Sequence, residues 1–268
     1  MQRVGFFGWF GQSALVVLGV CVLTGLAPAS VMDAPVAQEI QNTEEYFPDG
    51  IGSVWRYVGR TRTELIERVA DETFTNEVSA VGTTNIKGVT AKIFRETNQA
   101  NRGPTDGFFR RDKSGITYYG SHPTTPFEQQ LVPYRVLTFP LVMDRTFRQL
   151  NRKDVDMQVD MDGDGSHERA DVVAHVRVVG HGPVTVAAGT FSDALRLEAT
   201  MALTISLTKD RRVVVSTDTI TSWFARGVGL VKYLERVEMP PIRDTRGEVT
   251  HISEELESYT LKRTGGRL

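Results

Sequence analysis

The residues whose types and spacing most clearly support chemistry lie in one segment, residues 160–171, which reads DMDGDGSHERAD. Hard cations such as Ca²⁺ take several oxygen ligands at short range, and a calcium-binding loop supplies them from alternate positions, with glycine at the bend. Gly165 stands at the position of that glycine. The expected ligands are Asp160, Asp162, Asp164, the backbone of Ser166, Glu168 and Asp171.

The flanks of this segment indicate what kind of loop it is. An EF-hand has a helix on each side of its loop, whereas residues 154–160 and 171–179 alternate in polarity as strands do. The last expected ligand is Asp171, where Glu is usual. The pattern predicts a β-hairpin whose connecting loop holds a structural Ca²⁺. The competing interpretation is a solvated turn, because Asp and Gly are common turn residues.

The sequence shows no recognisable catalytic motif. Its histidines have neither HExxH nor close-pair spacing, and there is no GxSxG segment. Residues 227–232 (GVGLVK) lack the third glycine of a dinucleotide-binding loop, which favours a tight turn. We therefore expect no catalytic residues and no cofactor beyond Ca²⁺. A hydrolase with an unrecognised site is the third of three functional hypotheses.

The elements that would position such a loop are predicted to be long strands. From residue 195 to residue 207 the odd positions are apolar and the even positions are mostly polar. This period of two is typical of a strand with one buried face. The predicted buried face carries Leu195, Leu197, Met201, Leu203 and Ile205. We interpret residues 184–238 as a meander of long antiparallel strands on which the sheet is built.

Other alternating runs extend this sheet in both directions along the chain. We expect strands over residues 63–81, 88–99 and 251–261, and a hairpin over 108–119. Residues 121–140 hold four prolines, a density that a central strand does not tolerate, so they are expected to cross one mouth or edge of the sheet. The predicted fold is all-β: a large curved antiparallel meander or half-open barrel with few short helices.

The N-terminus has the pattern of an export signal. Residues 13–26 form an apolar core of signal-peptide length, and Ala27-Pro28-Ala29 offers a cleavage site. An uncleaved anchor and, third, a lipoprotein modified at Cys21 are the alternatives. We expect a signal peptide (1–29), a flexible tether (30–45), a single all-β domain (46–262) and a tail (263–268), in an exported periplasmic or extracellular protein.

Charge and cysteine content narrow the partners. A formal charge of -2 argues against binding nucleic acid or an anionic membrane, so membrane contact is expected only through an uncleaved N-terminal segment. The single cysteine permits no intramolecular disulfide. The oligomeric state stays open.

Three phrases resemble a known family. They are YFP followed by Gly52 and WRY at residues 46–57, FPL at 139–141, and VTVAAGTF at 184–191 together with WFARGVGLVK at 223–232. The combination is similar to a family of exported bacterial β-proteins that carry domain-of-unknown-function labels. Asp144 and Phe147 stand where Gly and Trp are expected, and Arg226 replaces a usual Pro. The resemblance implies no catalytic residues. By looser analogy it implies the curved sheet of periplasmic lipoprotein and lipid carriers.

Two functional hypotheses precede the hydrolase. The first is a non-catalytic exported binding or structural module of the cell envelope, with an envelope protein as partner. The second is a carrier that holds an acyl chain or another apolar ligand in the concave face of the sheet. The aromatic residues either fill the core or line such a cavity: Trp55, Tyr57, Phe94, Phe108, Phe109, Tyr118, Tyr119, Trp223 and Phe224.

Overall fold

The structure is a computed structural model that describes residues 38–65, 68–98, 103–242 and 247–262. The expected signal peptide, the first half of the expected tether (residues 30–37) and the expected tail lie outside these residues. In the described part of the chain, no helix is long and apolar enough to cross a membrane.

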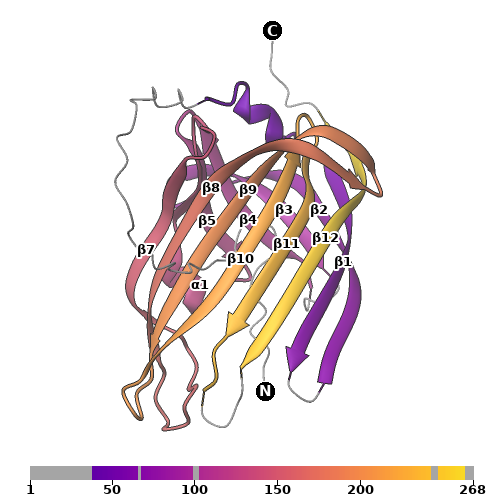
Figure 1. Cartoon of the computed structure of the whole chain (residues 1–268). Helices are drawn as coiled ribbons and strands as arrows, with labels where there is room; N and C mark the ends of the chain where they lie inside the picture. Colours follow the sequence, from indigo (N-terminus) through magenta and orange to yellow (C-terminus); the bar gives the residue numbers. More distant parts are fainter. Residues whose placement is uncertain (1–37, 66–67, 99–102, 243–246, 263–268) are drawn as a thin grey trace, which may run out of the picture.

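The described residues are almost entirely in strands, with one short α-helix and one 3₁₀ turn (Figure 1). The strands are β1 (Val54–Leu65), β2 (Arg68–Ile86), β3 (Val89–Asn98), β4 (Thr105–Asp112), β5 (Gly115–His122), β6 (Tyr134–Thr138), β7 (Thr146–Asp156), β8 (Arg169–Val186), β9 (Gly189–Ser206), β10 (Val213–Ala225), β11 (Gly229–Met239) and β12 (Glu248–Thr260). The helical segments are η1 (Thr43–Tyr46) and α1 (Pro126–Leu131).

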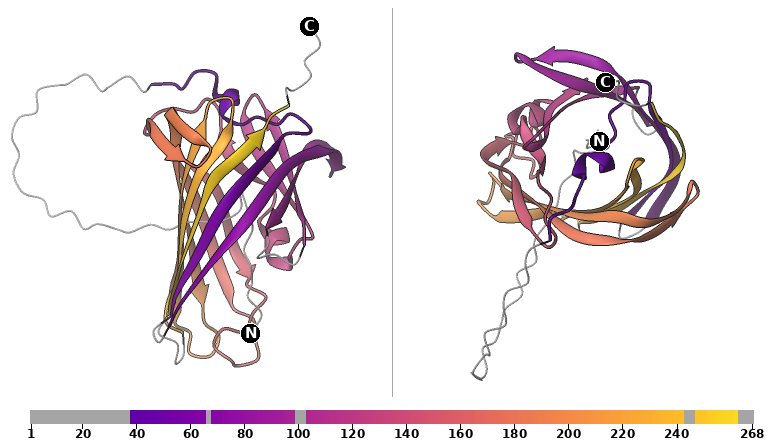
Figure 2. Two further views of the ribbon diagram at one scale, coloured as in Figure 1. Left: turned by 90° about the vertical axis from the view of Figure 1, so that its right-hand side faces the viewer. Right: turned by 90° about the horizontal axis from the view of Figure 1, so that it is seen from above.

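All strands belong to one sheet of 12 strands, in the order β6-β5-β4-β3-β2-β1-β12-β11-β10-β9-β8-β7. Every pairing is antiparallel. Consecutive strands are sheet neighbours except β6 and β7, which are the two ends of the order, and β12 joins β1 although they are the last and first strands of the chain. Seen from above, the sheet curls into a nearly complete ring (Figure 2). The predicted all-β curved meander or half-open barrel with few short helices is therefore confirmed.

The ring is joined at its seam by side chains, because β6 and β7 are the two ends of the sheet order. The Gln130 Nε2 of α1 donates to the backbone oxygen of Asp156 at 2.9 Å, and Asp156 N donates to Gln130 Oε1 at 2.9 Å. The Arg152 guanidinium donates to the backbone oxygen of Leu131 at 2.8 Å. Helix α1 thus connects the two sheet edges.

The interior face follows from alternation, since paired residues on neighbouring antiparallel strands point to the same side. On β9 the residues predicted to be buried are so: Leu195, Leu197, Met201, Leu203 and Ile205 are between 0% and 8% exposed. Their register partners on β8 include Val172, Ala174 and Val178, which are also buried. This side of the barrel is a filled apolar core.

The upper mouth is covered by the segment that precedes β1 (Figure 2). Ile40 N donates to Leu141 O at 2.8 Å, and the Tyr46 side chain is 0% exposed. The Trp55 Nε1 donates to Val228 O at 2.6 Å, which ties β1 to the β10–β11 turn. Residues 38–45, the described part of the expected tether, therefore pack against the barrel.

Several element boundaries differ from the expected ones. The run over residues 63–81 is divided between the end of β1 and the start of β2. The proline-rich segment 121–140 holds α1 and the edge strand β6. The alternating run 154–160 leaves the sheet at Asp156, and residues 157–168 form a loop closed by hydrogen bonds from Met157 N to Glu168 O and from Glu168 N to Val159 O.

Candidate functional site

The aspartate-rich loop, residues 157–168, connects β7 to β8. Its two flanking strands pair antiparallel, so the predicted hairpin context is correct. The loop contacts the β9–β10 turn, where Lys209 N donates to Asp162 Oδ2 at 2.8 Å.

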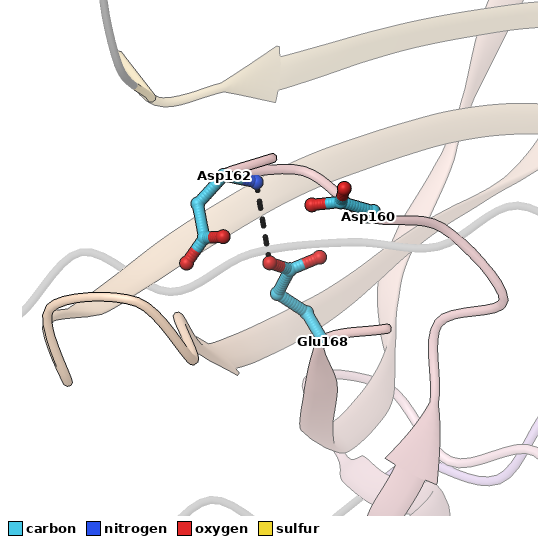
Figure 3. Close-up of side chains that lie close together, drawn as sticks. All are labelled: Asp160, Asp162 and Glu168. Carbon is cyan, nitrogen blue, oxygen red and sulfur yellow. Dashed lines mark hydrogen bonds between the residues drawn. The ribbon is translucent and has the colours of Figure 1, made fainter. Parts of the chain in front are cut away.

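Three carboxylates of the loop converge (Figure 3). Asp160, Asp162 and Glu168 each offer an oxygen, and these oxygens lie within 4.8 Å of one another. Asp162 is 3% exposed and Glu168 is 0% exposed, whereas Asp160 is exposed. Backbone amides shape the cluster: Met161 N donates to Glu168 Oε2 at 2.5 Å, and Asp162 N donates to Glu168 Oε1 at 3.2 Å.

One acceptor in this cluster lacks a partner. The Oδ1 of Asp162 makes no hydrogen bond although it is buried. Leaving a buried carboxylate oxygen unpaired is costly. A hard cation between these oxygens would pair that atom and neutralise crowded negative charge. The donor set therefore fits Ca²⁺ in type, with Asp160, Asp162 and Glu168 as its protein ligands.

Two of the other predicted ligands, Asp164 and Asp171, lie outside this cluster, and the backbone of Ser166 stays a predicted ligand. Asp164 is exposed, and its Oδ1 accepts from Ser166 N at 2.8 Å, a hydrogen bond that lowers the Asp164 pKa. The Ser166 side chain is exposed. Asp171 lies within β8 and accepts from Lys153 Nζ at 2.6 Å, which lowers its pKa. The spacing identified the loop, and the structure brings three of the predicted ligands together.

A second candidate site, which sequence reasoning missed, lies inside the barrel. We name it the interior row: Asp218 on β10, Glu235 on β11, Glu254 on β12, Asn76 on β2 and Glu96 on β3. Each of these side chains is between 2% and 7% exposed. Together they place four carboxyl groups and one amide in the barrel interior.

Hydrogen bonds join the row in two parts. The Asn76 Nδ2 donates to Glu96 Oε1 at 3.0 Å and to Glu254 Oε2 at 3.2 Å. The Tyr233 hydroxyl donates to Glu235 Oε2 at 2.7 Å, and the Asp218 carboxyl hydrogen-bonds to that of Glu235. Tyr233 is the register partner of Glu254, so the two parts are neighbours.

Burial raises the pKa values of the row. The pKa of Glu96 is raised to about 8 by burial and then by the nearby Glu254. Burial raises the pKa of Glu254 to about 7 and that of Glu235 to about 7. Burial and the neighbouring Glu235 raise the pKa of Asp218 well above its ordinary value. Near neutral pH, Glu96, Glu235 and Glu254 are therefore partly protonated.

The signal that could have revealed the row is its phase within the strands. Glu254 is in phase with the buried Leu256, and Asp218 is in phase with the buried Ile220. Placing these residues beside Glu235, Asn76 and Glu96 in the barrel interior requires the register between β10, β11, β12, β1, β2 and β3. That register is not readable from a single sequence.

Near the upper mouth the interior is packed by aromatic side chains. Five of the nine aromatic residues singled out from the sequence are at most 7% exposed: Trp55, Tyr57, Phe109, Tyr118 and Phe224. A cavity of about 40 Å³ remains there, lined in part by Phe47, Phe94 and Phe109. Ligand pockets for drug-sized molecules are commonly about 300–1,000 Å³, so this cavity suits a few waters and not an acyl chain.

The outer face behind the interior row carries an open concavity of about 400 Å³, lined by Arg60, Arg62, Arg236 and His251. Its arginines already have carboxylate partners: Asp71 for Arg60, Glu64 for Arg62 and Glu238 for Arg236. Exposed pairs of this kind contribute little energy, and they leave this face without a strong excess of positive charge.

No protein-family model matches this sequence, and no curated protein matches it. Two solved structures show a distant likeness. One, from Bacteroides fragilis NCTC 9343, is described as a protein inferred to be exported with a YmcC-like fold; it is 12% identical, covers 80% of this chain and 98% of its own, and has a TM-score of 0.37. The other, an inferred lipoprotein from Parabacteroides distasonis ATCC 8503, is 14% identical, covers 80% and 98%, and has a TM-score of 0.34.

These descriptions agree with the resemblance of the sequence to exported bacterial β-proteins. At such TM-scores the likeness carries no argument about what this chain does. The two candidate sites therefore have to be interpreted from their own geometry.

Proposed function

We propose that this chain is a non-catalytic, exported binding module of the cell envelope whose aspartate-rich loop holds a structural Ca²⁺. The observation that carries the calcium part is the buried Asp162, whose unpartnered Oδ1 lies in a cluster with Asp160 and Glu168. The signal-peptide pattern at residues 1–29 supports export.

The ion would act as a clamp between two hairpins. Asp162 is fixed on one side by the β9–β10 turn through Lys209 N, and Glu168 directly precedes β8. A cation bound to both carboxylates holds the β7–β8 loop against the β9–β10 turn at one end of the barrel. Calcium sites in extracellular modules bind weakly, with Kd values on the order of 10⁻⁴–10⁻³ M.

The packing of the upper interior favours a module over an apolar carrier. The aromatic side chains and the cavity of about 40 Å³ leave no room for an acyl chain in that part of the barrel. Mass spectrometry of lipid extracted from the purified protein tests this directly. Stoichiometric bound lipid would contradict the proposal, and clean protein is expected.

Calorimetric titration with Ca²⁺ tests the site. We expect saturable binding of one ion to the protein and loss of that binding in Asp162→Asn, which keeps the side-chain size and an oxygen for Lys209 N. Asp164→Asn is the matched control, because Asp164 is in the same loop but outside the cluster. Absence of heat together with an unchanged melting temperature in millimolar Ca²⁺ would refute the calcium site.

A further inference from the structure

The interior row differs from an ordinary buried acid of this protein. Glu128 on α1 is 3% exposed, and both of its carboxylate oxygens accept hydrogen bonds, from Tyr118 Oη at 2.5 Å and from Ser121 Oγ at 2.8 Å. In the interior row, by contrast, Asn76 Oδ1, Asp218 Oδ1 and Glu235 Oε1 are buried and have no hydrogen-bond partner. The row therefore offers Asn76 Oδ1 as a buried acceptor without a donor, and a pair of carboxyls, Asp218 and Glu235, that can hydrogen-bond to each other only by sharing a proton.

The charges around the row are of one sign. Glu96 and Glu235 each feel the carboxyl of Glu254, and Asp218 feels that of Glu235. Tyr233, whose pKa is raised by burial and by Glu235 and then Asp218, contributes a hydroxyl and no positive charge. A ligand that supplied both N–H donors and positive charge would pair these acceptors and relieve this repulsion.

The shape of the row favours an extended ligand over a single metal ion. Its members span β10 to β3, five strand spacings of about 4.8 Å each, or roughly 24 Å along the curved sheet. Within the described residues, the group of three metal-ligating side chains with oxygens inside 4.8 Å is the aspartate-rich loop and not the row. Several separated cationic centres on one slender chain match the row better.

Solvent reaches the inner face beside the row. Thr61, Thr250 and Ile252 point into the barrel and are half-buried. Glu72, the register partner of Thr61, is exposed and places a further carboxylate on this face. These residues lie along the strands between the β1–β2 end of the barrel and Glu254.

From these observations we propose that the interior row binds a linear aliphatic polyamine, whose ammonium groups donate to Glu254, Glu235 and Asp218 on the adjacent strands β12, β11 and β10. The inference rests on the proposed role as a binding module and is independent of the Ca²⁺ site. Because ammonium groups favour the ionised carboxylates, binding near pH 7 releases protons, and affinity rises between pH 6 and pH 8.

The test is calorimetric titration of the purified protein with spermidine, in two buffers of different ionisation enthalpy. We expect saturable binding with proton release, and at least a tenfold loss of affinity in Glu254→Gln, which keeps the acceptor for Asn76 Nδ2. The matched control is Glu255→Gln, since Glu255 is the next residue on β12 but pairs with Lys232 on the outer face. Its affinity should be unchanged.

Three outcomes overturn the inference. One is the absence of saturable heat with millimolar spermidine while circular dichroism shows a folded protein. A second is an equal loss of affinity in Glu254→Gln and Glu255→Gln, which would indicate surface attraction. The third is binding without proton release. If Ca²⁺ binds and spermidine does not, this inference fails while the proposed function stands. Retained spermidine binding in Asp162→Asn separates the two sites.

Discussion

The aspartate-rich loop and the interior row are both clusters of carboxylates, but they are built in opposite ways. The loop draws Asp160, Asp162 and Glu168 from a stretch of nine consecutive residues, 160–168, and folds them together with backbone amides. The row draws single residues from five strands that range from β2 to β12. Local sequence forms the first cluster, and only the pairing of β1 with β12, from the two ends of the chain, brings the second together.

The difference decides how each cluster handles its charge. The loop lies at an end of the barrel, where Asp160 is exposed to water and backbone N–H groups donate to Glu168. The row lies among interior side chains, where burial raises the carboxyl pKa values toward neutrality. The loop is therefore suited to a hard cation that takes several oxygen ligands at short range. The row is suited to a cationic ligand whose binding releases protons from the carboxyls.

The largest expected effect is a fall in stability as pH rises. Glu96 has a folded pKa of about 8, raised from 4.5. The stability that protonated Glu96 gives the folded state is fully present below its unfolded pKa of 4.5. It is lost as the pH rises through its folded pKa of about 8. At roughly 1.4 kcal/mol per pKa unit, the loss is several kcal/mol between about pH 4.5 and 8. Urea unfolding without polyamine at pH 5 and pH 8 measures it.

The substitution Glu96→Gln should flatten this dependence, because it removes the titrating group and keeps an oxygen for Asn76 Nδ2. We expect it to stabilise the protein at pH 8 and to change little at pH 5. Glu255→Gln, on the outer face of β12, is the control and should keep the original slope. If Glu96→Gln and the parent protein lost stability equally between pH 5 and pH 8, the row would not be a strained acidic cluster.

The second effect belongs to the loop. Ca²⁺ at about 100 times its Kd should stabilise the protein by roughly 2.7 kcal/mol, because the ion binds the folded state. Asp162→Asn should abolish this gain, and Asp164→Asn should keep it. Thermal unfolding with and without Ca²⁺ gives the measurement. If Asp162→Asn and Asp164→Asn lost the stabilisation by Ca²⁺ equally, the ligand set expected from spacing would be favoured. The contrast between Asp162 and Asp164 would then disappear.

Much of the fold was accessible from alternation alone. The interior face of β9 was predicted correctly residue by residue, because each of its apolar side chains points to the same filled core. The hairpin context of the loop was also correct. Strand ends were less accessible. The run at 154–160 looks like a strand, yet Glu168 N donates to Val159 O and Met157 N donates to Glu168 O, so this stretch closes the loop.

The candidate sites divide in the same way. Asp160, Asp162 and Glu168 were predicted as ligands because they are close in sequence. Asp164 and Asp171, expected from the same spacing, lie outside this group of oxygens, and their role as ligands stays a prediction. The interior row was missed entirely. A carboxyl in phase with a buried leucine, such as Glu254 with Leu256, is a local signal, but its partner Asn76 is 178 residues away.

A third and smaller effect probes the row at a single hydrogen bond. Tyr233→Phe removes the hydroxyl that donates to Glu235 Oε2 and should cost about 1 kcal/mol. That hydrogen bond lowers the Glu235 pKa. In the variant the Glu235 pKa should therefore rise above about 7. A pH titration followed by carboxyl carbon NMR checks this. Tyr259→Phe, at an exposed tyrosine, is the control. An unchanged Glu235 titration would show that the hydroxyl plays no part in the row.

The smallest expected effect separates the loop from its sequence pattern. Asp171 accepts from Lys153 Nζ at 2.6 Å and from Asp154 N at 3.1 Å on the surface of the β7–β8 hairpin. Since exposed ion pairs contribute little, Asp171→Asn should leave both stability and Ca²⁺ affinity unchanged within error. Glu168→Gln, measured beside it by the same calcium titration, should lose the ion. Loss of Ca²⁺ binding in Asp171→Asn would mean that the loop rearranges when the ion binds. The ligand set expected from the sequence spacing, which includes Asp171, would then describe the bound state.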